Sequence, residues 1–197
     1  MGRLIQRVLA SDKCCVTVCT GTDSALEVIF NQPADVVLLD ITLASVASAE
    51  LVMLGKMGKT PVIILTDVDD EAVLVDCVEA GAFDLLLKPF TPEQLEQCVS
   101  LALSCNLDGK AAIGNEQELP ASVAGRLGDK PISLSELRFL AALTARPAQT
   151  VLYQEILRSM YGRNYREYAR LAQAWATRLK QKVRLSEFMG VGYALAI

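Results

Sequence analysis

Three short apolar runs, each followed by a polar residue, constrain the fold of the first half of this chain. The runs are residues 36–39 before Asp40, residues 61–65 before Thr66 and residues 85–87 before Lys88, and the third strand is expected to begin at Asp84. Apolar residues at every position of so short a run are typical of strands buried on both faces of a parallel sheet. Segments with helical spacing separate the runs, so the sequence predicts a doubly wound α/β domain.

Further segments complete this predicted domain. We expect helices at residues 3–11, 23–30, 69–80 and 91–105, and another strand at residues 15–19. Thr91, with Gln94 three residues later, predicts the N-cap of the last helix. The apolar residues of the first segment have helical spacing, which favours a helix there. The alternative is that residues 7–10 form a strand, paired in a hairpin with residues 15–19.

The most basic segment lies near the C-terminus, at residues 163–184. It carries seven Lys or Arg side chains and one acidic residue, Glu167. Asn164 and Glu167 predict a capping box at the start of a helix. Apolar residues then recur at helical spacing, and they are Leu171, Ala172, Trp175, Ala176, Leu179 and Val183. The segment therefore predicts a helix with one face in a core and a basic face opposite to it.

The elements around this helix form a recognisable layout. Two helices are expected before it, at residues 134–144, where Ser133 and Glu136 form the cap, and at residues 153–161. Two short strand-like pieces follow it, joined by glycines at positions 190 and 192. Helices followed by a glycine hairpin are the layout of a winged helix. We therefore predict a first domain at 1–106, a linker with short strands at 107–130 and a winged-helix domain at 131–197.

Charge is divided unevenly between the two halves. Residues 1–106 carry 6 basic and 15 acidic side chains, a net charge of −9, whereas residues 107–197 carry 13 basic and 8 acidic side chains, a net charge of +5. Only the second half is therefore expected to meet a polyanion. The chain has no histidine, which excludes Ser-His and Cys-His catalysis. It also lacks an apolar run of the ~18 residues that a membrane span needs. We expect a cytoplasmic protein that is not an enzyme and does not bind membranes.

Motifs in both halves resemble one known family. The recognition helix of OmpR/PhoB-type response regulators is similar to residues 170–183, RLAQAWATRLKQKV, and the end of their wing is similar to residues 190–195, GVGYAL. In the first half, Asp40, Thr66 and Lys88 stand where receiver domains of this family carry their phosphorylation site. The resemblance implies a flavodoxin-like receiver domain followed by a winged helix-turn-helix DNA-binding domain.

The resemblance also assigns roles to these three residues, and the sequence departs from the family's pattern at the start of the receiver. It makes Asp40 the phosphoacceptor, Thr66 the hydroxyl that binds a phosphoryl oxygen, and Lys88 the cation beside them. Receivers of the family begin with a strand and an acidic pair that holds Mg²⁺, and neither has a counterpart in this sequence. Because Mg²⁺ prefers a carboxylate-rich octahedral site, we expect the Mg²⁺ site to be lost, no other cofactor to be bound, and phosphorylation to be impaired.

The basic helix supplies the candidate DNA-binding residues. We predict a groove-facing set of Arg170, Gln173, Thr177 and Arg178, and a phosphate-binding set of Lys180, Lys182 and Arg184. Arg and Lys side chains recognise guanine in the major groove, and phosphate contacts add salt-dependent affinity. We therefore interpret the chain as a sequence-specific, DNA-binding transcriptional regulator that does not depend on phosphorylation. Its expected partners are double-stranded DNA and RNA polymerase.

A homodimer is also predicted. The family dimerises through a face made by helix 4, strand 5 and helix 5 of the receiver. On that face this chain has Leu74, Leu85 and Cys98 in place of polar, basic or aromatic residues. If Leu74 and Cys98 face outward, their burial stabilises association by roughly 25 cal/mol per Å² without a phosphoryl group. The sequence therefore predicts a constitutive homodimer through the receiver-like domain.

Two other functions are compatible with the sequence. The first is a protein-interaction module that has lost DNA binding, because Met189 and Ala194 replace arginines of the family's wing and Glu187 places a carboxylate near the phosphates. The second is a regulator that senses a small molecule in the vacated phosphorylation pocket.

Overall fold

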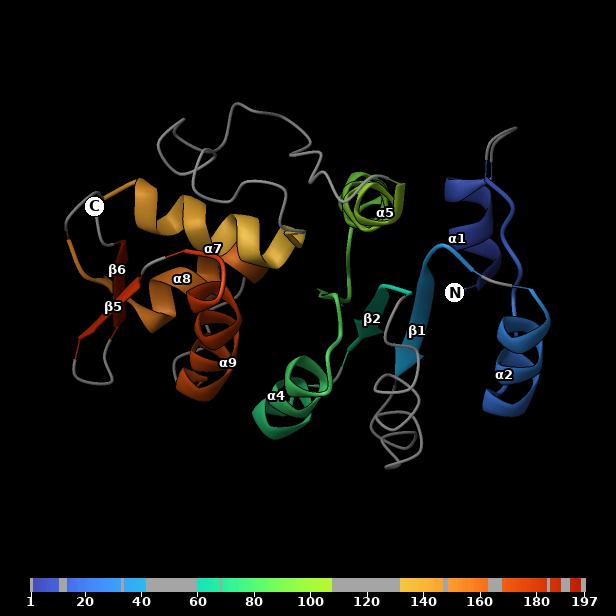
Figure 1. Cartoon of the computed structure of the whole chain (residues 1–197), viewed down its shortest axis with the longest axis horizontal. Coiled ribbons are helices and arrows are strands. Elements are labelled where there is room, and N and C mark those ends of the chain that lie inside the picture. The colour runs from blue at the N-terminus through green and yellow to red at the C-terminus, as the bar shows by residue number, and fades with distance from the viewer. Residues whose placement is uncertain are drawn as a thin grey trace.

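The computed structural model contains two groups of helices and strands, each with its own sheet (Figure 1). The described residues are 2–10, 14–32, 34–41, 60–67, 69–107, 132–146, 149–162, 168–183, 185–188 and 192–195. The predicted linker at 107–130 lies outside the described residues from 108 onward. None of the described helices is both long and apolar enough to cross a membrane.

The first group of elements, here called the N-terminal domain, follows the predicted alternation of strands and helices. Its elements are α1 Gly2–Leu9, α2 Thr22–Asn31, β1 Val37–Ile41, β2 Val62–Thr66, α4 Glu71–Glu79, β3 Asp84–Leu87 and α5 Pro92–Leu107. The helix predicted near the N-terminus is confirmed as α1, so the alternative strand at residues 7–10 is wrong. The predicted cap of α5 is also confirmed, because Gln94 N–H donates to Thr91 Oγ1 and Thr91 N–H donates to Gln94 Oε1.

The sheet of this domain is parallel, in the order β1-β2-β3. Strand β2 lies in the middle and every residue of it is buried, as its apolar run predicts. Strand β1 was expected to be buried on both faces, but Val37, Leu38 and Leu39 are only half-buried because β1 is at the edge of the described sheet. The strand predicted at residues 15–19 is wrong. A strand needs a paired neighbour, and no described strand pairs with this segment.

Helices cover both faces of the sheet. Helix α5 lies on one side of it and α4 on the other (Figure 1), and α1 packs against α5. Helix α4 begins at Asp70, whose side chain accepts a hydrogen bond from Ala72 N–H. This arrangement confirms the doubly wound α/β fold and brings the carboxyl ends of β1 and β2 to one edge of the sheet.

The second group, here called the C-terminal domain, has the layout of a winged helix. Its elements are α7 Leu134–Thr144, β4 Val151–Leu152, α8 Tyr153–Tyr161, α9 Ala169–Lys180, β5 Leu185–Phe188 and β6 Gly192–Leu195. Both predicted support helices are confirmed. Ser133 and Glu136 form the capping box of α7, and Gly162 ends α8 in the left-handed conformation, with a φ of 69° that favours glycine.

An antiparallel sheet in the order β4-β6-β5 closes this domain. Its core contains Phe139, Tyr153, Trp175 and Tyr193, and the ring of Tyr193 lies 5.9 Å from Phe139 and 5.5 Å from Tyr153. The structure explains why one position of the hairpin motif, Gly192, is a glycine. A Cβ at this position would lie 2.1 Å from the Val151 carbonyl oxygen, so β6 pairs this closely with β4 only without a side chain there.

Candidate functional site

Helix α9 is held in place by an apolar face that faces its own domain. Leu171, Ala172, Trp175, Ala176 and Leu179 are all buried. The Trp175 indole N–H donates to the Tyr161 hydroxyl oxygen at 2.8 Å, which fixes the helix against α8. The amphipathic helix predicted from the sequence is therefore confirmed from Ala169 onward. The predicted cap at Asn164 and Glu167 lies outside the described residues.

The predicted DNA-binding residues separate into two groups in the structure. Arg170, Thr177 and Lys180 are exposed, and Gln173 is half-buried. Arg178 and Lys182 were also predicted to face DNA, but both reach the buried carboxylate of Glu136. Lys182 Nζ lies 2.6 Å from Glu136 Oε2, and Arg178 Nε lies 3.7 Å from Glu136 Oε1. Arg184 lies outside the described residues.

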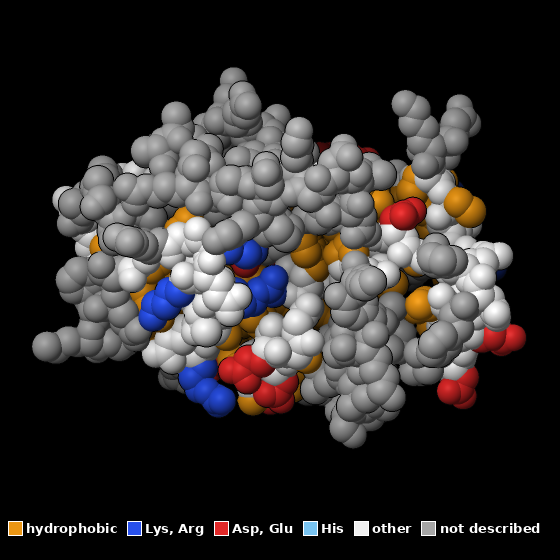
Figure 2. All heavy atoms as spheres, viewed as in Figure 1, with side chains coloured by type: hydrophobic (Ala, Val, Ile, Leu, Met, Phe, Trp, Pro, Cys, Tyr) orange, Lys and Arg blue, Asp and Glu red, His pale blue; other side chains and the backbone are white. Residues whose placement is uncertain are grey.

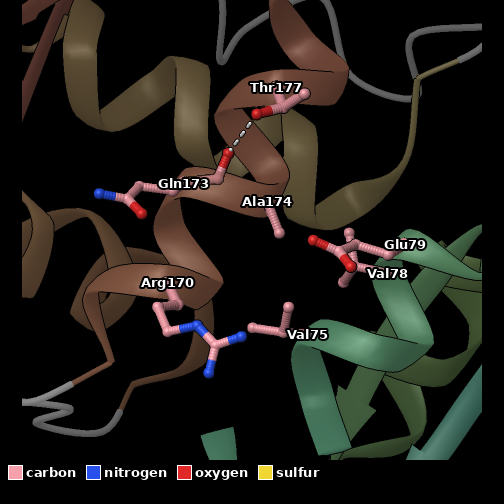
Figure 3. A pocket seen from close by; sticks show the side chains of 7 residues that line it. All are labelled: Val75, Val78, Glu79, Arg170, Gln173, Ala174 and Thr177. Atoms are coloured by element: carbon pink, nitrogen blue, oxygen red, sulfur yellow. Dashed lines mark hydrogen bonds between the residues drawn. The ribbon is translucent and has the colours of Figure 1, made fainter. Parts of the chain in front are cut away.

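The polar face of α9 lies against α4 of the N-terminal domain (Figure 3). Leu171 N–H donates to Glu71 Oε1 at 3.1 Å, and the Tyr168 hydroxyl donates to Asp69 Oδ1 at 2.9 Å. A guanidinium N–H of Arg178 donates to the carbonyl oxygen of Ala82. Helix α4 therefore lies beside the face that was predicted to enter the DNA groove, while Arg170 and Thr177 on this face stay exposed.

Between the two helices lies a partly open hollow of about 270 Å³. Arg170, Gln173, Ala174 and Thr177 line it from α9, and Val75, Val78 and Glu79 line it from α4 (Figure 3). Lys and Arg side chains gather over the C-terminal domain, and acidic side chains lie beside them over α4 (Figure 2). The two helices thus meet through hydrogen bonds to Asp69 and Glu71 and a loosely filled contact.

The predicted phosphorylation residues meet at the carboxyl edge of the parallel sheet. Lys88 Nζ lies 2.5 Å from Asp40 Oδ1, and the side chains are 15% and 40% exposed. Thr66 is fully buried, and its carbonyl oxygen accepts a hydrogen bond from Lys88 N–H at 2.8 Å. The structure therefore brings the three residues together, with the carboxylate of Asp40 already paired to a cation.

The described residues at this edge do not fit a Mg²⁺ site. Among the residues that the structure describes, no group of three or more His, Cys, Asp and Glu side chains could hold a metal ion. One Asp40 oxygen accepts from Lys88, whereas Mg²⁺ takes near-ideal octahedral oxygen coordination that usually includes more than one carboxylate or a phosphate.

Comparison with known proteins gives the family. The model of the response regulator receiver domain matches residues 1–100. The chain is 33% identical over 156 residues to the DNA-binding response regulator MtrA of Mycolicibacterium smegmatis, covering 76% of this chain and 68% of MtrA. The chain belongs to the response regulator family.

A second relative extends the similarity over both domains of this response regulator. The transcriptional regulatory protein AfsQ1 of Streptomyces coelicolor is 27% identical over 193 residues, which cover 91% of this chain and 85% of AfsQ1. Together with the winged-helix fold, these relatives confirm the predicted resemblance to OmpR/PhoB-type response regulators. The N-terminal domain is therefore called the receiver domain below, and the C-terminal domain the effector domain.

The predicted dimer face of this response regulator is not exposed. Leu74, Leu85 and Cys98 are 0%, 2% and 1% exposed within the single chain. The expectation that Leu74 and Cys98 face outward is wrong, because both side chains pack in the hydrophobic core of the chain. In this conformation the three side chains have no surface to offer to a second copy.

Asp84 lies at the centre of the contact between the domains. It is fully buried at the start of β3. Its carboxylate accepts hydrogen bonds from Leu134 N–H at 2.9 Å, from Ser135 N–H at 3.3 Å and from the Ser135 hydroxyl at 2.5 Å. From its own domain it accepts from Leu85 N–H at 2.8 Å and from the Cys98 thiol at 3.5 Å. Burial raises the pKa of Asp84, and hydrogen bonds led by that of Ser135 oppose the rise.

Sequence reasoning missed Asp84 and assigned Glu136 only a capping role. Asp84 was taken as the first residue of a strand, although an ionisable residue beginning an otherwise buried strand is itself a signal of a dedicated partner. Glu136 was correctly predicted as the capping residue of α7, but nothing local indicated that it also pairs with Lys182. The partners Leu134, Ser135 and Lys182 come from distant parts of the chain.

Proposed function

We propose that this response regulator binds double-stranded DNA through α9 and regulates transcription. The observation that carries the proposal is the polar face of α9 in a winged-helix domain. Arg170, Gln173 and Thr177 lie at i, i+3 and i+7, so they project from one side of the helix. The opposite side is fixed in the core through Trp175 and its neighbours, which gives the helix a rigid base.

The chemistry of this face suits the major groove. Arg170 can donate two hydrogen bonds to one guanine, and Gln173 can pair with an adenine. Lys180 is exposed at the end of α9, where its ammonium group can reach a phosphate. Both MtrA of M. smegmatis, a DNA-binding response regulator, and AfsQ1, a transcriptional regulatory protein, support the same role for this chain.

Selection of duplexes from a random pool with the full chain at low salt tests the proposal. We expect a defined sequence to be recovered. Arg170→Ala should weaken its binding about ten-fold, as the loss of one base contact predicts. Arg7→Ala removes the same charge from the exposed surface of α1 and should leave binding unchanged. If no duplex is enriched, or if both variants weaken binding equally, the chain is a protein-interaction module and not a DNA reader.

We further propose that DNA binding does not require phosphorylation of Asp40. The ion pair between Asp40 and Lys88 and the poor fit of the edge to Mg²⁺ support this. The selected duplex should therefore bind equally well with Asp40→Ala and with the unmodified chain. A loss of binding in Asp40→Ala would show that the carboxylate is needed.

The remaining partners follow from the same proposal. A homodimer through this side of the receiver domain requires the two domains to separate first, because α4, β3 and α5 now contact the effector domain, and Leu74, Leu85 and Cys98 are themselves buried. A DNA-bound regulator of this kind acts in the cytoplasm, catalyses no reaction of its own and contacts RNA polymerase beside its site.

A further inference from the structure

The receiver domain caps a helix of the effector domain. The first N–H groups of any α-helix have no partner within the helix. In α7, Glu136 N–H donates to Ser133 Oγ inside the effector domain, but Leu134 and Ser135 N–H both donate to Asp84 of the receiver. A carboxylate is the favoured partner at this end of the helix dipole, and hydrogen bonds to a charged acceptor are about twice as strong as neutral ones.

A second set of contacts links this cap to α9. Glu136, the next residue of α7, is completely buried and accepts from Lys182, with Arg178 close by. Arg178 also donates to the Ala82 carbonyl oxygen, two residues before Asp84. The start of α7, the end of α9 and the start of β3 are therefore joined in one polar network between the domains.

The network holds α9 beside α4 of the receiver. The major groove is about 12 Å wide, and a helix with its side chains is about 10 Å across. The groove therefore has no room for α4 beside α9. The contact between α4 and α9 leaves the 270 Å³ hollow between Val75, Val78 and Ala174, so close packing there is incomplete.

We propose that Asp84 is the latch that keeps α9 against α4, so that DNA binding requires the contact between Asp84 and the start of α7 to break. The proposal rests on the proposed DNA-binding function and adds its regulation. In the closed conformation Arg178 donates to the Ala82 carbonyl oxygen of the receiver. Opening breaks this contact between the domains, whereas the ion pair of Arg178 with Glu136 lies within the effector domain.

Two latch variants and one control test this with the full chain. Asp84→Ala removes the acceptor, and Ser135→Ala removes one of its donors. Asp23→Ala removes the same charge as Asp84→Ala from the exposed surface of α2, so it controls for the effect of net charge on DNA affinity. Each variant is measured for affinity to the selected duplex and for radius of gyration by X-ray scattering, extrapolated to zero concentration.

We expect Asp84→Ala to bind the duplex about ten-fold more tightly than the unmodified chain, within the usual range of coupling between two sites. Its radius of gyration should increase, Ser135→Ala should show a smaller change in the same direction, and Asp23→Ala should change neither quantity. If Asp84→Ala fails to fold, Ser135→Ala decides by the same two measurements.

The two readouts separate the two proposals. An increased radius of gyration with no binding of any duplex supports the latch and overturns the DNA-binding function. An unchanged radius of gyration and affinity in both latch variants overturns the latch, whatever the unmodified chain binds.

Discussion

Asp40 and Asp84 lie on the same parallel sheet, but at opposite ends of it and in opposite environments. Asp40, near the end of β1, is 40% exposed and has one ion pair with Lys88. Asp84, at the start of β3, is completely buried and accepts five hydrogen bonds, three of them from the effector domain.

This difference indicates which of the two aspartates is coupled to the arrangement of the domains. A solvent-exposed ion pair contributes little, because water and salt screen it. A buried carboxylate cannot lose its donors without a large cost, so it fixes the position of whatever carries them. The family's phosphorylation position is therefore weakly coupled to the rest of the molecule, whereas Asp84 is directly coupled to α7 and through it to α9.

Stability gives the largest expected difference between the two aspartates. Asp84→Ala leaves buried donors of Leu85, Leu134 and Ser135 without an acceptor, so we expect a loss of about 2–4 kcal/mol. Asp40→Ala should cost about 1 kcal/mol or less. Denaturant unfolding of both variants measures this, and equal losses would contradict the comparison.

The second largest difference between the Asp84→Ala and Asp40→Ala variants is expected in their oligomeric state. Opening of the domains exposes the receiver surface of α4, β3 and α5 that now contacts the effector domain, so Asp84→Ala should form a concentration-dependent dimer. Asp40→Ala, like the unmodified chain, should stay monomeric at micromolar concentration. Light scattering decides between them. Leu74→Arg is a poor test, because Leu74 is buried and an unpaired charge there would unfold the domain.

A smaller effect is expected from chemical phosphorylation. Acetyl phosphate with Mg²⁺ should leave Asp40 largely unmodified, because Lys88 occupies it and the described residues supply no metal site. Intact-mass measurement would detect one added phosphoryl group. Near-stoichiometric addition would show that another carboxylate completes a site at this edge, and Asp40→Asn is the control that locates the modification.

The dependence of stability on pH should be the smallest effect. Burial raises the pKa of Asp84 above its ordinary value of 3.8, so the folded protein binds this proton more tightly than the unfolded chain does. The stability that the bound proton contributes is complete below pH 3.8 and is lost as the pH rises through the folded pKa. The groups facing Asp84 are Ser135 of α7 and Cys98 of α5, whose thiol pKa is raised well above 9.0 by burial and then by Asp84.

Asp84→Asn cannot ionise and should remove this dependence. The unfolding midpoint of the unmodified chain is expected to fall as the pH rises from 3.8 through the folded pKa of Asp84, whereas that of Asp84→Asn should change less. Asp40→Asn should keep the slope of the unmodified chain. A slope that is identical in all three proteins would show that Asp84 does not titrate in this range.

The sequence by itself determined the elements whose signals are local. The bounds of α7 and α8 agree with their caps and with Gly162, the buried strand β2 follows from its apolar run, and α9 follows from its helical spacing. The edge that carries Asp40 and Lys88 also followed, because parallel strands end at the same side of a sheet.

Only the tertiary structure decided which partners the charged residues have. Asp84 and Leu134 are 50 residues apart, and Arg178 and Ala82 are 96 residues apart. The period of a helix shows which residues share a face, but it does not show which element covers that face. For this reason Arg178 and Lys182 were predicted for DNA and are bound to Glu136, and Leu74 and Cys98 were predicted to be exposed and are buried. Packing between elements that are distant in the sequence decides both outcomes, and no local pattern encodes it.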